Sequence, residues 1–139
     1  MEMGLALGCM SLLYFGAVIA PGVGLSGYLM VQTPSVLLEW AHAPGYGILA
    51  WLLIRWLLRR NWPFSYALAV GSAASLVFGI WTEAFQGTVP GRQPSTDDLL
   101  IDAIGIFSAA ILASVRNQVV QAGTPVQILT VDARGVDLL

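Results

Sequence analysis

The stretch EAFQGTVPGRQPSTDD, residues 83–98, decides the fold because it separates two of the most apolar segments of the chain. It holds one of the six Lys and Arg residues and three of the eight Asp and Glu residues. The 139-residue chain is only 10% charged, whereas globular domains usually carry about 25% charged residues. With 57% hydrophobic residues and a mean hydropathy of +0.76, the composition is typical of an integral membrane protein.

The composition also argues against several classes of protein. The chain has no lysine, and its six arginines form no basic stripe, so we expect no nucleic-acid partner. The single cysteine, Cys9, cannot form an internal disulfide or build a thiolate metal site alone. The first apolar run lacks a positive n-region and is long for a secretory signal, so we interpret it as a retained helix.

Four apolar segments approach the length of about 20 residues that a membrane-spanning helix needs. They are residues 3–20, 39–58, 64–81 and 99–115. In lipid such segments form helices, and the chain lacks the period-2 alternation of a β-barrel. The sequence therefore predicts an all-α fold, a small bundle of four transmembrane helices in residues 1–116.

Two further segments are assigned less sharply. The uncharged residues 28–38 either lie at the membrane interface or extend the first helix after a kink at Pro21. Residues 117–139 form a polar C-terminal tail, in which VQILTVD, residues 126–132, alternates like a short strand.

The arginines predict the orientation of the bundle. Five of them fall on one side of a four-span arrangement: Arg55, Arg59, Arg60, Arg116 and Arg134. Only Arg92 falls on the other side. Since short cytoplasmic loops collect Lys and Arg, we expect a multi-pass protein of the cell inner (plasma) membrane with both termini cytoplasmic. The stretch 83–98 would then face outward.

Small residues indicate which helix faces pack together. Gly71, Ser75 and Gly79 recur at every fourth position, and Glu83 is the next step of that row. On the last span, Asp98, Asp102, Gly105 and Ala109 share one face. Small residues at this spacing let membrane helices approach closely, so both rows are predicted to point toward protein.

The predicted topology gathers polar side chains at the outer end of the bundle. EWAHAPGYG, residues 39–47, adds an acid and the only histidine to those of the stretch 83–98 and the last span. Eight side chains collect there, and all of them except Asp97 form our candidate functional cluster: Glu39, His42, Glu83, Gln86, Arg92, Asp97, Asp98 and Asp102.

These residues resemble the VanZ-like family of membrane proteins. Glu83 and Gln86 match the ExxQ of that family, VPGR supplies Arg92, and Asp98 and Gly105 stand at its loop Asp and helical Gly. A weaker similarity places Glu39 and His42 at its acidic and histidine positions near the second span.

The resemblance implies a four-helix membrane fold and an association with glycopeptide resistance, specifically to teicoplanin. It implies no mechanism. The chain departs from the family at Asp102, where an Asn is usual, and at Ala109, where a Gly is usual.

Three functional hypotheses remain open from the residues. In the first, Arg92 grips an anionic, lipid-linked or cell-wall-like ligand, although the acidic surplus opposes an anion unless acids are protonated or cation-bound. In the second, an enzyme acts on a lipid-linked precursor. Two carboxylates, Glu83 and either Asp98 or Asp102, work there with His42 as general acid and base, and a divalent cation relieves their repulsion.

In the third hypothesis the motif is a structural clasp of an accessory or scaffold subunit in a larger membrane complex. Arg92 pairs there with Glu83 or Asp98, and Asp97 or Thr96 caps the last helix. The predicted partners are membrane lipids, with a lipid-linked envelope precursor or other membrane-protein subunits besides. Since no spacing matches a known metal or phosphate-loop signature, no cofactor and no resident metal are predicted.

Overall fold

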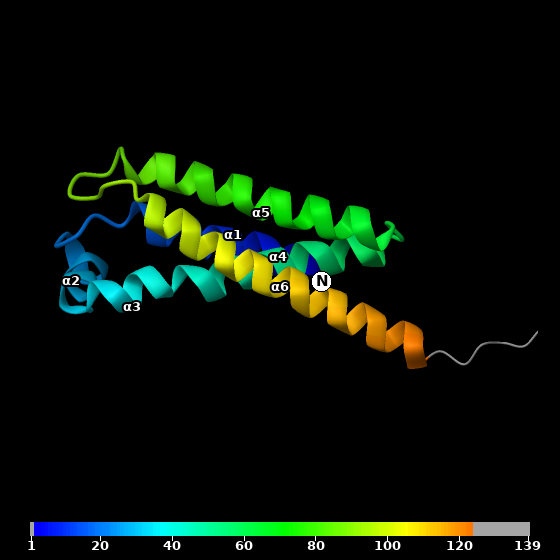
Figure 1. Ribbon diagram of the computed structural model, residues 1–139. Helices are drawn as coiled ribbons and strands as arrows, with labels where there is room; N and C mark the ends of the chain where they lie inside the picture. Colours follow the sequence, from blue (N-terminus) through cyan, green and yellow to red (C-terminus); the bar gives the residue numbers. More distant parts are fainter. Residues whose placement is uncertain (1, 124–139) are drawn as a thin grey trace, which may run out of the picture.

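The computed structural model describes residues 2–123, and every element in this range is an α-helix. The predicted all-α fold is confirmed for these residues. The elements, shown in Figure 1, are α1 (Glu2–Val18), α2 (Gly24–Gln32), α3 (Ser35–Trp40), α4 (His42–Arg59), α5 (Phe64–Gln86) and α6 (Thr96–Gly123). The expected strand at residues 126–132 lies outside the described residues, as does most of the predicted tail.

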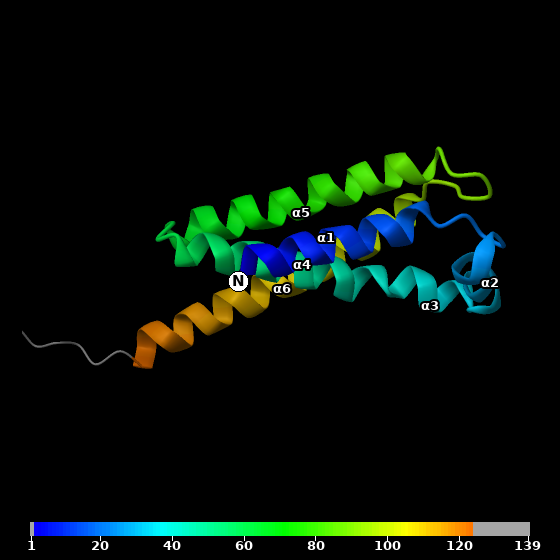
Figure 2. The ribbon, with the colours of Figure 1, turned by 180° about the vertical axis from the view of Figure 1, so that it is seen from behind.

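The helix α4 lies at the centre of the bundle, where it contacts α1, α5 and α6. The short helices α2 and α3 lie at one end, beside the loop that joins α5 to α6, in both views (Figures 1 and 2). The other end of α6 runs past the remaining helices (Figure 1). The additional elements, α2, α3 and the α5–α6 loop, are therefore gathered at one end of the bundle.

The chain breaks after α1 because its sequence there favours turns. Pro21 is followed by Gly22 and Gly24, which have φ angles of 76° and 66°, a region that glycine enters without strain. The N–H of Gly22 then donates to the carbonyl of Gly27 (2.9 Å). Residues 28–38, expected either at the interface or as an extension of the first helix, instead contribute to two separate short helices.

Four predicted boundaries are corrected. The last helix begins at Thr96 rather than at residue 99. The span expected to begin at residue 39 begins at His42, because α3 ends at Trp40 and a break follows at Ala41. The helix α5 continues to Gln86 rather than 81, so that Glu83 and Gln86 are helical. The last helix continues to Gly123 rather than 115, since no proline or glycine interrupts it after Gly105.

The predicted rows of small residues do form the packed faces. Gly71, Ser75, Gly79 and Glu83 are all buried, and a Cβ at Gly71 would lie 2.9 Å from the backbone nitrogen of Ile54. On α6, Asp102, Gly105 and Ala109 are buried. A Cβ at Gly105 would overlap the carbonyl oxygen of Ala43 on α4, so the backbones of α4 and α6 meet there.

Large apolar side chains cover the outside of the bundle. Val77 on α5 and Phe107 on α6 are 64% and 68% exposed. Within the described residues, α5 and α6 are long and apolar enough to cross a membrane, and only 22% and 28% of their apolar windows are buried. The core helix of a soluble protein would instead bury most of its apolar surface.

The close approach of α4 and α6 predicts an asymmetry between glycines. We expect Gly105→Ala to lower the apparent unfolding temperature in detergent, because overpacking costs about 1–3 kcal/mol. Gly8→Ala is the matched control, since an added Cβ at Gly8 meets no atom within 4 Å. Equal unfolding temperatures for the two variants would contradict the backbone contact.

Candidate functional site

A histidine and an aspartate from different helices form the inner part of the site. His42 is the first residue of α4, and its Nδ1 lies 3.2 Å from Oδ1 of Asp102 on α6. Asp102 is fully buried. Its carboxylate fits because a Cβ at Gly79 would lie only 2.9 Å from Oδ2, so the small-residue row of α5 provides the space for this acid.

Glu83 joins α5 to the start of α6. The side chain is 3% exposed, and its Oε2 accepts a hydrogen bond from the backbone N–H of Ser95 (2.9 Å). Within residues 2–123, the other oxygen, Oε1, is buried without a hydrogen-bond partner. Glu83 therefore has one oxygen, Oε1, available for a further contact at the N-terminus of α6.

Ser95 caps α6, and the expectation that Asp97 or Thr96 does so is wrong. Its Oγ accepts the backbone N–H groups of Asp97 (3.2 Å) and Asp98 (3.4 Å). In a capping box, an acid at the third helical position also accepts the N–H of the cap residue. Here Glu83 of α5 accepts the N–H of Ser95 instead. The side chain of Asp98, which is the third residue of α6, is therefore available for another contact.

Arg92 bonds to backbone carbonyls rather than to acids. Its NH2 donates to the carbonyl of Gly16 (2.6 Å) and contacts Sδ of Met30 (3.4 Å), and its Nε donates to the carbonyl of Ile19 (3.3 Å). A cation is favourable at the C-terminal end of α1, where the helix dipole is negative. Burial lowers the pKa of the guanidinium, and the charges of Glu83 and Asp98 oppose this.

The expected clasp between Arg92 and Glu83 or Asp98 is therefore wrong. Among the described residues, the ion pairs are His42 with Asp102, and Glu2 with Arg55 and Arg59. Arg92 ties the α5–α6 loop to the end of α1 and to α2 instead. The physical reason is that helix-end carbonyls lack intrahelical donors and compete for a nearby cation.

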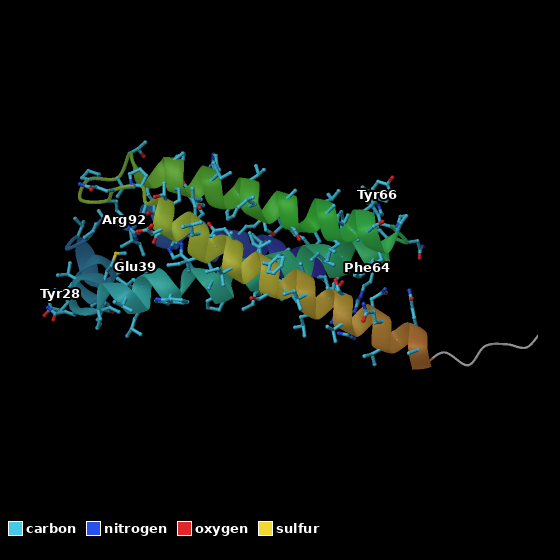
Figure 3. All side chains as sticks on the ribbon, viewed as in Figure 1. Tyr28, Glu39, Phe64, Tyr66 and Arg92 are labelled. Carbon is cyan, nitrogen blue, oxygen red and sulfur yellow. The ribbon has the colours of Figure 1, made fainter. Side chains whose placement is uncertain are left out.

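A cavity of about 700 Å³ opens beside these contacts. One part of its wall is polar and comes from five of the seven candidate residues, with five further polar side chains: Glu39, His42, Gln86, Arg92, Asp98, Ser26, Thr33, Tyr46, Thr82 and Gln93. The other part is apolar and includes Leu12, Leu13, Leu29, Met30 and Leu38. Figure 3 shows Glu39 and Arg92 at this end, with Phe64 and Tyr66 at the opposite one.

The other two candidate residues, Glu83 and Asp102, adjoin the cavity wall without being part of it. Asp102 holds His42, and Glu83 holds the backbone that precedes Asp98. One ligand atom from each of His42, Glu83 and Asp98 lies within 4.8 Å of the other two. All seven residues are thus located at one end of the bundle, and three of them bring possible ligand atoms for a metal ion within 4.8 Å of one another.

Sequence reasoning missed Thr82 and the role of Ser95. The Tyr46 hydroxyl and Thr82 Oγ1 share a hydrogen bond in the interior, and Thr82 also donates to the carbonyl of Gly79 (2.9 Å). No sequence signal distinguishes Thr82 from other helical threonines. Ser95 does carry one, because Ser followed three positions later by an acid is a helix-start pattern.

Glu2, at the far end, was also missed. Its Oε1 lies 3.0 Å from Arg55 Nε and 3.0 Å from Arg59 NH2, and the residue is only 6% exposed. The predicted topology already placed the N-terminus on the arginine side, so charge complementarity was the available signal.

Comparison with protein-family models, curated proteins and solved structures finds no match to this chain. The resemblance to the VanZ-like family thus rests on the residues 39–47 and 83–105 alone. The geometry of the cavity is an independent line of argument for function.

The capping geometry predicts a difference between two adjacent residues. We expect Ser95→Ala to lower stability by about 1 kcal/mol, the usual cost of losing an N-cap, and to speed hydrogen exchange at the Asp97 and Asp98 amides. Thr96→Ala is the control and should leave both unchanged. If Thr96→Ala had the larger effect, Ser95 would not be the cap.

Proposed function

We propose that the chain is a VanZ-like multi-pass membrane protein whose polar cavity binds the headgroup of a lipid-linked envelope compound at the outer face of the plasma membrane. The observation that carries this proposal is the mixed lining of the 700 Å³ cavity. A headgroup would meet His42, Gln86 and Asp98, while an attached hydrocarbon chain would meet Leu12, Leu29 and Met30. Such a two-part wall suits an amphipathic ligand.

In this proposal Arg92 positions the cavity wall and does not bind the ligand itself. Its guanidinium already donates to Gly16 and Ile19 and contacts Met30, so it sets the distance between the α5–α6 loop and the α1–α2 wall. His42 and Asp98 also line the cavity and are half-buried, and because neither donates to the α1–α2 wall they are better placed to meet a ligand. Teicoplanin resistance is the phenotype that we associate with this binding.

The proposed topology has four spans, α1, α4, α5 and α6, with both termini cytoplasmic. The apolar exposed faces of α5 and α6 support two of the spans. The helix α1 has 17 residues, which is about 25 Å at 1.5 Å per residue. Arg55 and Arg59 lie on the last turns of α4, at the end away from the cavity.

Cysteine labelling tests this orientation. On a Cys9→Ser background, we expect Thr88→Cys in the α5–α6 loop to react with an impermeant maleimide on intact cells, and Ser65→Cys at the start of α5 not to react. Both replaced residues are exposed and close in size to cysteine. Lysed cells, in which both sites should react, are the control. The reverse pattern would move the cavity to the cytoplasmic side.

Filling the cavity tests ligand binding. We expect native mass spectrometry of the wild-type protein to show a retained lipid-linked sugar or phosphate compound, and Ser26→Trp to abolish retention because Ser26 lines the cavity. Ser11→Trp, on an exposed part of α1 outside the lining, should retain it. In a sensitive host, we likewise expect the wild type and Ser11→Trp to lower teicoplanin susceptibility and Ser26→Trp not to lower it.

Two outcomes would contradict the proposal. Equal retention by Ser26→Trp and Ser11→Trp would separate the compound from the cavity. Stoichiometric co-purification with other membrane subunits and no retained compound would favour an accessory subunit.

A further inference from the structure

We propose that His42, Glu83 and Asp98 form a binding site for a divalent transition cation of the Zn²⁺ type. They belong to α4, α5 and α6, and one ligand atom from each lies within 4.8 Å of the others. Ligands of tetrahedral Zn²⁺ lie about 2.0–2.1 Å from the ion, and hence roughly 3.4 Å apart. Side-chain shifts of about an ångström would bring the three ligand atoms from within 4.8 Å of one another to the separation found around bound Zn²⁺.

Asp102 contacts one ring nitrogen of His42 and so leaves the other as the ligand for the proposed cation. Its Oδ1 lies 3.2 Å from Nδ1 of His42, so a proton on Nδ1 donates to Asp102 and the lone pair is left on Nε2. Carboxylates that orient a ligating histidine in this way are the usual outer partners of metal sites. A nitrogen ligand with two carboxylates favours Zn²⁺ over the oxygen-seeking Mg²⁺ and Ca²⁺.

Glu83 supplies the observation that points to a ligand independently of the spacing. The side chain is 97% buried, and its Oε1 has no hydrogen-bond partner within residues 2–123. An unsatisfied buried polar atom costs about 1–3 kcal/mol, and more when it is charged. A cation bound at Oε1 would remove this cost without disturbing the bond from Ser95 to Oε2.

The negative charge around the cavity also favours a bound cation. The cavity end contains five acids, Glu39, Glu83, Asp97, Asp98 and Asp102, of which Glu83 and Asp102 are buried, whereas its one arginine donates to carbonyls. Buried charges of one sign need a counter-charge. A divalent cation supplies it where Glu83 and Asp98 approach each other.

The cation also extends the proposed function. Three protein ligands leave a fourth position open, and since His42 and Asp98 line the cavity, that position faces it. A phosphate or carboxylate oxygen of the ligand would bind there, which removes the conflict between an acidic wall and an anionic headgroup. Ligand binding at the open position rests on the proposed function, whereas the cation site itself does not.

Zinc content of the full-length protein in detergent tests the site. After chelator treatment, exposure to Zn²⁺ and gel filtration, we expect one Zn²⁺ per chain by elemental mass spectrometry, with neither Mg²⁺ nor Ca²⁺ retained. Asp98→Asn and His42→Gln should each lose the zinc. Asp97→Asn is the matched control, because Asp97 is the exposed neighbour of Asp98 and carries the same charge.

Asp102→Asn separates orientation from ligation. Loss of an outer carboxylate weakens metal affinity by about 10–100-fold, so this variant should bind Zn²⁺ in competition with a chromophoric chelator, but more weakly than the wild type. Zinc should raise the unfolding temperature of the wild type and Asp97→Asn and leave that of Asp98→Asn unchanged. Circular dichroism of each variant verifies that its helices are intact.

The inference is overturned if the wild type retains no more zinc than Asp98→Asn, or if Asp97→Asn loses as much as Asp98→Asn. Its failure is distinguishable from failure of the proposed function. A zinc-free wild type that still retains a lipid-linked compound would reject the cation alone, whereas zinc bound without any retained compound would reject the ligand.

Discussion

The close backbone approach of α4 and α6 is the constraint on which the site depends. Gly105 leaves no room for a Cβ beside the Ala43 carbonyl, and a Cβ at Gly47 would lie 3.0 Å from the carbonyl oxygen of Gly105. At this separation His42, one residue before Ala43, meets Asp102, one turn before Gly105. Gly79 of α5 then leaves the space that the buried carboxylate occupies. Three glycines thereby bring a histidine and an acid together inside an apolar bundle.

The start of α6 is held by residues from two parts of the chain, and Glu83 of α5 replaces Asp98 as the acceptor of the Ser95 N–H. Ser95 caps the helix, and Glu83 reaches across from α5 to accept the Ser95 N–H. Asp98, which would take that part in a local capping box, is left with its carboxylate at the cavity wall. The same residues thus end one helix, begin another and supply acids to the site.

Much of this arrangement follows from short-range patterns. Apolar runs located the four long helices, and the i, i+4 rows of small residues identified their packed faces, since both depend only on helix geometry. The gathering of Glu39, His42, Gln86, Arg92 and Asp98 followed from the number of apolar helices between them. Helix ends were less predictable, because Glu83 and Gln86 continue α5 although they are polar.

The errors concern partners that sequence distance hides. Arg92 was paired with acids close to it in the chain, yet its donors reach carbonyls of Gly16 and Ile19, which no side-chain pattern records. Thr82 and Tyr46 meet only through the packing of α5 on α4. The ion pairs of Glu2 depend in the same way on where α1 lies against α4, and helix packing of this kind is set by tertiary contacts rather than by local propensity.

The bonds of Arg92 also bear on the order in which the protein is made. The carbonyls of Gly16 and Ile19 are satisfied by a residue that is 76 and 73 positions later in the chain. During synthesis, the end of α1 must therefore bond to solvent until the α5–α6 loop has emerged. Contacts of such long separation form late. The bundle can thus pack its first helices early, while the cavity is completed only when the last helix packs against them.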